Sequence, residues 1–138
     1  MRPPDPSPRL GIQLSSLGTG PPGPLLESAA AAGFNGVGLS SKETAEWVDS
    51  GFSCADLRRE LRARDLDADY LDPLMLWIGR GEPTFATLPD DRVLELATEL
   101  EVPLVNVTIG GDYDEAEAID AFASVAHRIA KAGMRPMV

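Results

Sequence analysis

Short apolar runs alternate along this chain with longer amphipathic stretches. Residues 10–14 (LGIQL) alternate in polarity and are prone to β-structure, and residues 36–39 (GVGL) form a second short run. Residues 67–71 begin a third run, and residues 102–109 (VPLVNVTI) are almost continuously apolar. A continuous apolar run is typical of a parallel strand that is buried on both faces. The pattern predicts four β-strands at these positions.

The segments between these runs carry apolar residues at helical spacing. Proline at the start and glycine at the end delimit the first helix, from Pro24 to Gly33. Ser40 and Glu43 have the spacing of a capping box, which predicts a second helix. Further helices are expected to begin near Ser53, near Asp90 and in the acidic residues 112–117. This alternation specifies a parallel α/β sheet with right-handed crossovers.

The third strand is expected to end at Asp72, because proline restricts the residue before it. Residues 73–89 then form a loop that is long for this architecture and contains Trp77. Long loops often bind ligands or close over them. Trp77 is expected either to stack on a ligand ring or simply to cover the site.

The last residues of the chain indicate which part of a larger fold the sequence covers. Residues 134–138 follow a helix that ends at Gly133 and are typical of the start of a fifth strand. Periodicity alone does not separate an open doubly wound sheet from part of a barrel, but an ending inside a strand favours part of a barrel. A whole (β/α)₈ barrel needs roughly 250 residues. We therefore expect residues 9–138 to form the N-terminal half of such a TIM barrel, apparently truncated, with four β-α units and the start of strand five. Residues 1–8 are expected to be a flexible, proline-rich leader.

Charge and cysteine content narrow the class of protein. The chain has 22 acidic and 12 basic residues and a net charge of −10, which argues against nucleic acid or membrane partners. It has no apolar run long enough to cross a bilayer and no hydrophobic signal core, so a cytoplasmic location is expected. Its single cysteine, Cys54, rules out an internal disulfide and is expected to pack in a helix.

Three segments carry a resemblance to a known family. GIQLSSL (11–17), LLESAAAAGFNGVGLS (25–40) and VPLVNVTIGG (102–111) resemble the xylose isomerase-like TIM-barrel superfamily. Its members include sugar-phosphate isomerases and epimerases, hydroxypyruvate isomerases and inosose dehydratases. The resemblance covers residues 9–138 and implies the fold more firmly than the reaction, because one fold hosts many chemistries.

Polar side chains are expected where the strands end, since barrels of this type carry their chemistry at the carboxyl ends of the strands. Directional donors and acceptors there suit a small polyhydroxylated substrate. The candidate substrate-binding residues are Gln13, Ser15, Ser40, Asp72, Trp77, Asn106 and Thr108. For Asp72 a second interpretation is open, because a residue before proline can simply shape a turn.

The resemblance also implies a divalent metal (Mn, Mg, Co or Zn), held by acidic and histidine residues on later strands, the first a glutamate on strand five. No residue of this sequence matches those ligands, so no catalytic residue, metal ligand or cofactor is assigned to this chain alone. Members often have an acid in strand two, where this chain has Gly38. The only histidine, His127, is expected at the surface of a helix.

Two functions follow as hypotheses. The first is a sugar-phosphate isomerase or epimerase that uses metal-assisted proton transfer when its barrel is complete, this chain alone being inactive. The alternative is a non-catalytic half-barrel that binds a polar small molecule or self-assembles through its open sheet. Because the inner face of the sheet, with Ile12, Leu39 and Val107, would need a partner, a dimer or larger homo-oligomer is expected.

Overall fold

The strands of the chain pair in the order of the sequence. In the computed structural model, which describes residues 9–80, 83 and 88–138, five parallel strands form one sheet with the order β1-β2-β3-β4-β5. The strands are β1 (Gly11–Gln13), β2 (Gly36–Ser40), β3 (Asp67–Gly79), β4 (Leu104–Asp112) and β5 (Arg135–Met137). In a doubly wound sheet the strand order reverses at a switch point. The unbroken order found here is that of a barrel wall, which confirms the predicted four β-α units and the start of a fifth strand.

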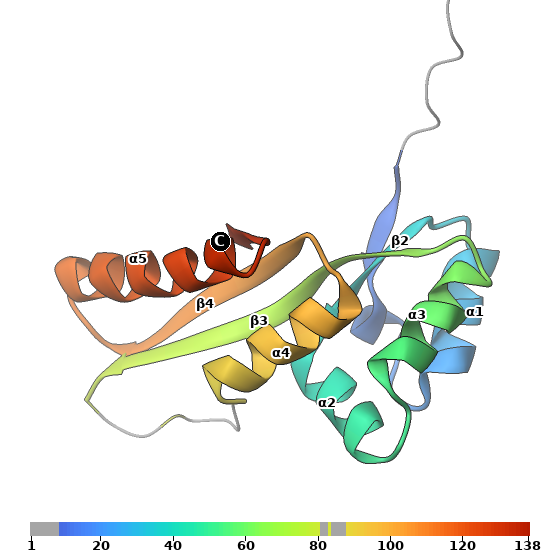
Figure 1. Cartoon of the computed structure of the whole chain (residues 1–138), viewed down its shortest axis with the longest axis horizontal. Coiled ribbons are helices and arrows are strands. Elements are labelled where there is room, and N and C mark those ends of the chain that lie inside the picture. The colour runs from blue at the N-terminus through green and yellow to red at the C-terminus, as the bar shows by residue number, and fades with distance from the viewer. Residues whose placement is uncertain (1–8, 81–82, 84–87) are drawn as a thin grey trace, which may run out of the picture.

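Helices connect these strands at the places that the sequence predicts, with shifted ends. They are η1 (Leu14–Leu17), α1 (Pro22–Ala31), α2 (Ser41–Asp49), α3 (Cys54–Arg62), α4 (Asp90–Leu100) and α5 (Glu115–Lys131). Full capping boxes begin α3, with Ser53, and α5, with Asp114. The first helix begins at Pro22 instead of Pro24. Figure 1 shows α5 lying along the long strands β3 and β4.

The helices bury one face of the sheet. Strand residues and helix residues belong to a single apolar cluster, which includes Val37, Leu39, Leu71 and Val105 from the strands and Leu26, Leu57, Leu96 and Ile129 from the helices. Leu26, Leu39, Leu71, Leu96, Val105 and Ile129 have no exposed surface. Burial of this apolar area is the main force that holds the layers together.

The opposite face of the sheet, here called the inner face, carries mainly small and polar residues, with the bulky Met75 and Trp77 farther along β3. Since side chains alternate across a strand, it carries Gln13, Gly38, Ser40, Tyr70, Asp72, Asn106 and Thr108. The expectation that Ile12, Leu39 and Val107 lie on the inner face is therefore wrong. Leu39 and Val107 are 0% and 2% exposed in the core, and Ile12 packs against the core. On β2 the bulky residues Val37 and Leu39 point toward the helices, and the positions between them point inward.

Strand β3 does not end at Asp72 but continues to Gly79. Its register with β4 shifts between Leu71 and Leu74, so that three steps along β3 match two along β4. Such a bulge accommodates a proline inside a strand. The predicted loop over residues 73–89 is therefore wrong for its first seven residues.

Part of the predicted loop and the whole predicted leader are not among the described residues. Residues 81, 82 and 84–87, like the leader at residues 1–8, lie outside the described residues. Within the part of the chain that the structure describes, no helix is both long and apolar enough to cross a membrane.

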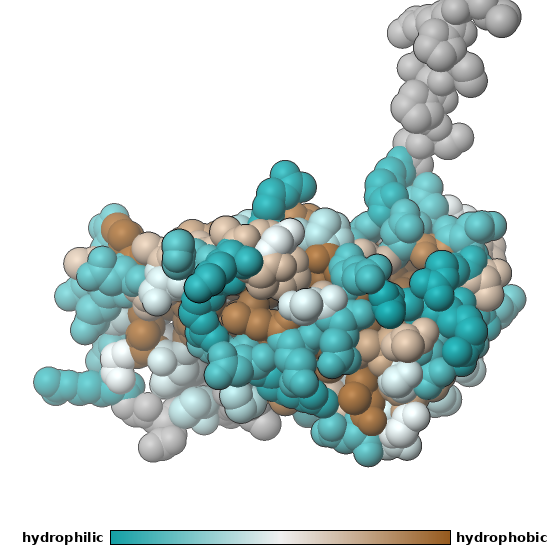
Figure 2. Space-filling model, viewed as in Figure 1, coloured by the Kyte–Doolittle hydropathy of each residue, from teal (hydrophilic) through white to brown (hydrophobic). Residues whose placement is uncertain are grey.

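The surface agrees with the acidic composition. Figure 2 shows hydrophilic side chains over much of one side of the molecule, with hydrophobic residues in separate patches between them. Several charges form ion pairs, such as Arg64 with Glu27 at 3.0 Å and with Glu60 at 2.7 Å. Exposed pairs of this kind contribute only about 0–1 kcal/mol each.

Candidate functional site on the inner face

The sheet register brings most of the predicted substrate-binding residues to one face of the sheet. Gln13 of β1 lies opposite Gly38 of β2, and Ser40 at the end of β2 lies opposite Asp72 of β3. Asn106 follows on β4. These side chains lie on one face of four neighbouring strands, Gln13 and Ser40 at the ends of β1 and β2, and Asp72 and Asn106 within the longer strands β3 and β4.

Asp72 and Asn106 contact each other directly. The Asn106 side-chain Nδ2 donates a hydrogen bond to Asp72 Oδ1, and both side chains are partly buried. Because Asp72 lies inside β3, it does not shape a turn, and that interpretation is wrong. The bond fixes one carboxylate oxygen of Asp72 and leaves the second one available as an acceptor.

Tyr70 belongs to the same face and is absent from the sequence-based set. Its ring fills the space beside Gly38, where an added Cβ atom would lie 2.1 Å from Tyr70 Cζ and 2.4 Å from Gln13 Oε1. Burial raises the pKa of the Tyr70 phenol, and the charges of Asp72 and Asp69 raise it further. The phenol therefore stays protonated near neutral pH and can donate a hydrogen bond.

Gln13 points its side-chain carbonyl into this packed region. Gln13 Oε1 is buried and has no hydrogen-bond partner in the described structure. A buried acceptor without a partner is unfavourable by about 1–3 kcal/mol. In this position it is a group that a hydroxyl of a ligand could satisfy after a small movement of the Tyr70 ring.

The three serines near the strand ends have different roles. Ser40 caps α2, and its hydroxyl accepts a hydrogen bond from the Glu43 backbone N–H at 3.3 Å. Ser41 is 3% exposed and donates to the Pro73 carbonyl oxygen at 2.8 Å, which joins α2 to β3. Ser15 lies on η1 and is exposed, off the sheet. Of the three, Ser40 lies on the inner face.

Trp77 and Thr108 lie farther along the two long strands. Thr108 is exposed and pairs with Met75, and Trp77 pairs with Gly110. An added Cβ atom at Gly110 would lie 3.0 Å from the Trp77 ring, so the ring lies against β4. Trp77 is five residues past Asp72, about 16 Å at strand spacing. It is on a strand instead of a loop, beyond the row that Gln13, Ser40, Asp72 and Asn106 form.

Other candidate chemistry does not meet at this site. Among the described residues no group of three or more His, Cys, Asp or Glu side chains could hold a metal ion. His127 is exposed on α5, as predicted. Cys54 is 3% exposed, and burial raises the pKa of its thiol to about 11, which confirms a packing role.

Comparisons with known proteins identify the fold of the chain. No family model and no curated protein matches the chain. A sugar phosphate isomerase/epimerase from Parabacteroides distasonis matches with a TM-score of 0.67 and 14% identity, over 96% of this chain and 51% of that one. D-psicose 3-epimerase, solved in the presence of D-fructose, matches with 0.63 and 14%, over 91% and 50%. A family 2 AP endonuclease from Brucella melitensis matches with 0.62 and 22%, over 94% and 54%.

The chain therefore has the fold of about half of a TIM barrel and spans about half the length of these solved structures. The matches include an epimerase, a probable dehydratase and an endonuclease. A shared fold with such varied chemistry does not fix the reaction. The reaction has to be argued from the side chains.

Proposed function

We propose that this chain is the substrate-holding half of a sugar or sugar-phosphate isomerase or epimerase. The observation that carries the proposal is the row of donors and acceptors on the inner face, the side that is the interior in a barrel of this kind. The similarity in fold to D-psicose 3-epimerase and to a sugar phosphate isomerase/epimerase supports a polyhydroxylated substrate.

Each group has a role that its surroundings favour. Asp72, held by Asn106, accepts a hydrogen bond from a substrate hydroxyl. Tyr70 donates one through its phenol O–H, which is protonated at neutral pH. Gln13 Oε1 accepts a second hydroxyl and gains the partner that it lacks. Three directional groups on adjacent strands can fix both the position and the orientation of a polyol.

The resemblance implies that a divalent metal supports proton transfer between neighbouring carbons of the sugar in a complete barrel. The described residues do not fit a metal by themselves, since they contain no group of three suitable side chains. The part that we assign to this chain is therefore to bind and orient the substrate, and the chain alone is expected to be inactive.

The test is a metal-supplemented assay of ketose–aldose interconversion and epimerisation, on protein that continues through all eight strands. We expect activity, and a loss of about tenfold or more when Asp72→Asn removes the charged acceptor. Thr98→Ala on the outer surface of α4 is the matched control and should leave the rates unchanged. A folded barrel with neither activity nor metal binding would refute the proposal.

A second candidate function is assembly, and one observation favours it. Among the described residues, β1 and β5 each pair with a strand on one side only. Exposed strand edges favour pairing with another chain. Sedimentation at micromolar concentration should show a dimer or larger assembly, whereas a stable, monodisperse monomer would exclude this function.

A further inference from the structure

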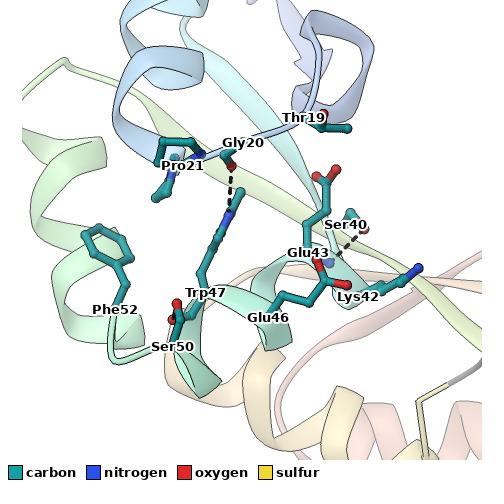
Figure 3. A pocket seen from close by; sticks show the side chains of 11 residues that line it. Thr19, Gly20, Pro21, Ser40, Lys42, Glu43, Glu46, Trp47, Ser50 and Phe52 are labelled. Atoms are coloured by element: carbon teal, nitrogen blue, oxygen red, sulfur yellow. Dashed lines mark hydrogen bonds between the residues drawn. The ribbon is translucent and has the colours of Figure 1, made fainter.

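A cavity of about 690 Å³ lies beside the inner face, between the loop that follows η1 and helix α2. Its walls come from the start of α1, from α2 and from Ser50 and Phe52, which follow α2. Only Ser40 belongs both to the cavity and to the inner face. The cavity is therefore a separate compartment at the rim of the half-barrel, and Figure 3 shows it from close by.

One wall of the cavity is apolar and rigid. Trp47 is 8% exposed, and its indole N–H donates a hydrogen bond to the Gly20 carbonyl oxygen at 3.1 Å. Pro21 and Pro22 line the cavity nearby, and Phe52 adds a second aromatic ring. Because the indole is held by its hydrogen bond and the prolines have a fixed backbone angle, this wall requires little ordering when a ligand binds.

The other wall is negatively charged. Glu43 and Glu46 line the cavity, and Lys42 is its one lining cation. No ion pair joins Lys42 to either carboxylate in the described structure. Figure 3 shows Glu43 extending toward Thr19 across the cavity and Lys42 extending away from Glu43. The balance of charge in the cavity is therefore negative.

Glu43 is also incompletely satisfied. Its Oε2 atom is buried and has no hydrogen-bond partner in the described residues, although its backbone N–H is fixed by Ser40. Burial raises the pKa of the Glu43 carboxyl, and Glu46 raises it further, while the charge of Lys42 acts in the opposite direction without cancelling the rise. A carboxylate in this position is stabilised by an incoming donor that carries positive charge.

We infer that this cavity binds a small organic cation, an alkylammonium or guanidinium group, with the charge against Glu43 and Glu46 and the carbon atoms against Trp47 and Phe52. Aromatic faces and carboxylates both attract such cations. An anion would be repelled by the two carboxylates. A divalent metal would lack a third ligand, because the described residues contain no group of three metal-binding side chains. The inference does not depend on the proposed function.

The test uses the full chain, labelled with ¹⁵N, and two probes of equal shape. n-Butylammonium chloride should cause saturable shifts of the backbone amides of Thr19, Gly20, Glu43 and Trp47, at constant ionic strength. n-Butanol should bind about tenfold more weakly, since it lacks the charge-assisted hydrogen bond.

Two variants separate the site from general electrostatics. Glu43→Gln should weaken butylammonium binding about tenfold. Glu115→Gln, which removes an exposed first-turn glutamate from α5, makes the same change in net charge and should leave binding within twofold. Equal binding of butanol, equal effects of the two variants, or shifts spread over the acidic surface would each overturn the inference.

Discussion

Glycine at position 38 leaves room on the inner face for two larger side chains. The Tyr70 ring and the Gln13 amide occupy the volume that a side chain on β2 would fill. The phenol of Tyr70, from β3, thus occupies a position at which β2 has no side chain. The sequence alone does not show that Gly38 and Tyr70 are neighbours, because only the register of β2 against β3 brings them together.

Gly38→Ala is expected to destabilise the chain by about 1–3 kcal/mol, because the added methyl group must displace the Tyr70 ring. The measurement is urea unfolding. In a Tyr70→Ala background the same change should cost less, since the ring is gone and only the contact with Gln13 Oε1 remains. Additive effects of the two substitutions would contradict this packing account.

The Glu43 carboxyl provides a test that depends on pH. Its pKa is raised in the folded state, chiefly by burial, so ionisation above the unfolded pKa of about 4.3 opposes folding. Wild-type stability should therefore fall as the pH rises from that value through the raised pKa. Glu43→Gln lacks this loss and should be more stable than wild type at pH 7.

The comparison is made by urea unfolding at pH 7 and pH 3.5, with Glu115→Gln as the matched variant. The difference between Glu43→Gln and wild type should shrink at the lower pH, where the wild-type carboxyl is protonated in both states. A difference that is independent of pH, or a destabilised Glu43→Gln at pH 7, would contradict the assignment.

At the scale of elements, the sequence predicts which helices and strands are present better than it predicts where they end. Capping residues such as Ser53 and Asp114 act within one turn, so these helix starts are readable locally. The continuation of β3 past Pro73 is not readable from the local sequence, because the bulge there depends on pairing with β4. The face assignment failed for a related reason. The alternation of Gly36 and Gly38 with Val37 and Leu39 was the available signal, because bulky side chains are buried against the helices.

The continuation of β3 can be tested at Leu74, which has no exposed surface. Leu74→Ala should cost about 2–5 kcal/mol of unfolding free energy, because it leaves a cavity in the core. Leu17→Ala, at a position that is 36% exposed, is the control and should cost much less. Equal small effects would mean that residues after Pro73 do not pack as a strand.

At the scale of the whole molecule, the strand order and the helix-covered face describe half of a barrel wall. The sequence predicts this layout because each β-α unit carries its own periodicity. The rule on strand ends gives Gln13 and Ser40 their places, whereas Asp72 and Asn106 lie within β3 and β4, and the role of all four in binding stays a prediction. The sequence does not predict the cavity beside α2, because Trp47, Glu43 and the prolines meet there only through tertiary packing.

The central claim is that the inner face of this half-barrel holds a polyhydroxylated substrate. The most direct measurement is a titration of the ¹⁵N-labelled chain with D-fructose, followed by amide shifts. The account predicts saturable shifts at Gln13, Ser40, Tyr70, Asp72 and Asn106, which Asp72→Asn weakens. An absence of shifts, or shifts confined to the opposite end of the strands near Arg9 and Arg58, would contradict it.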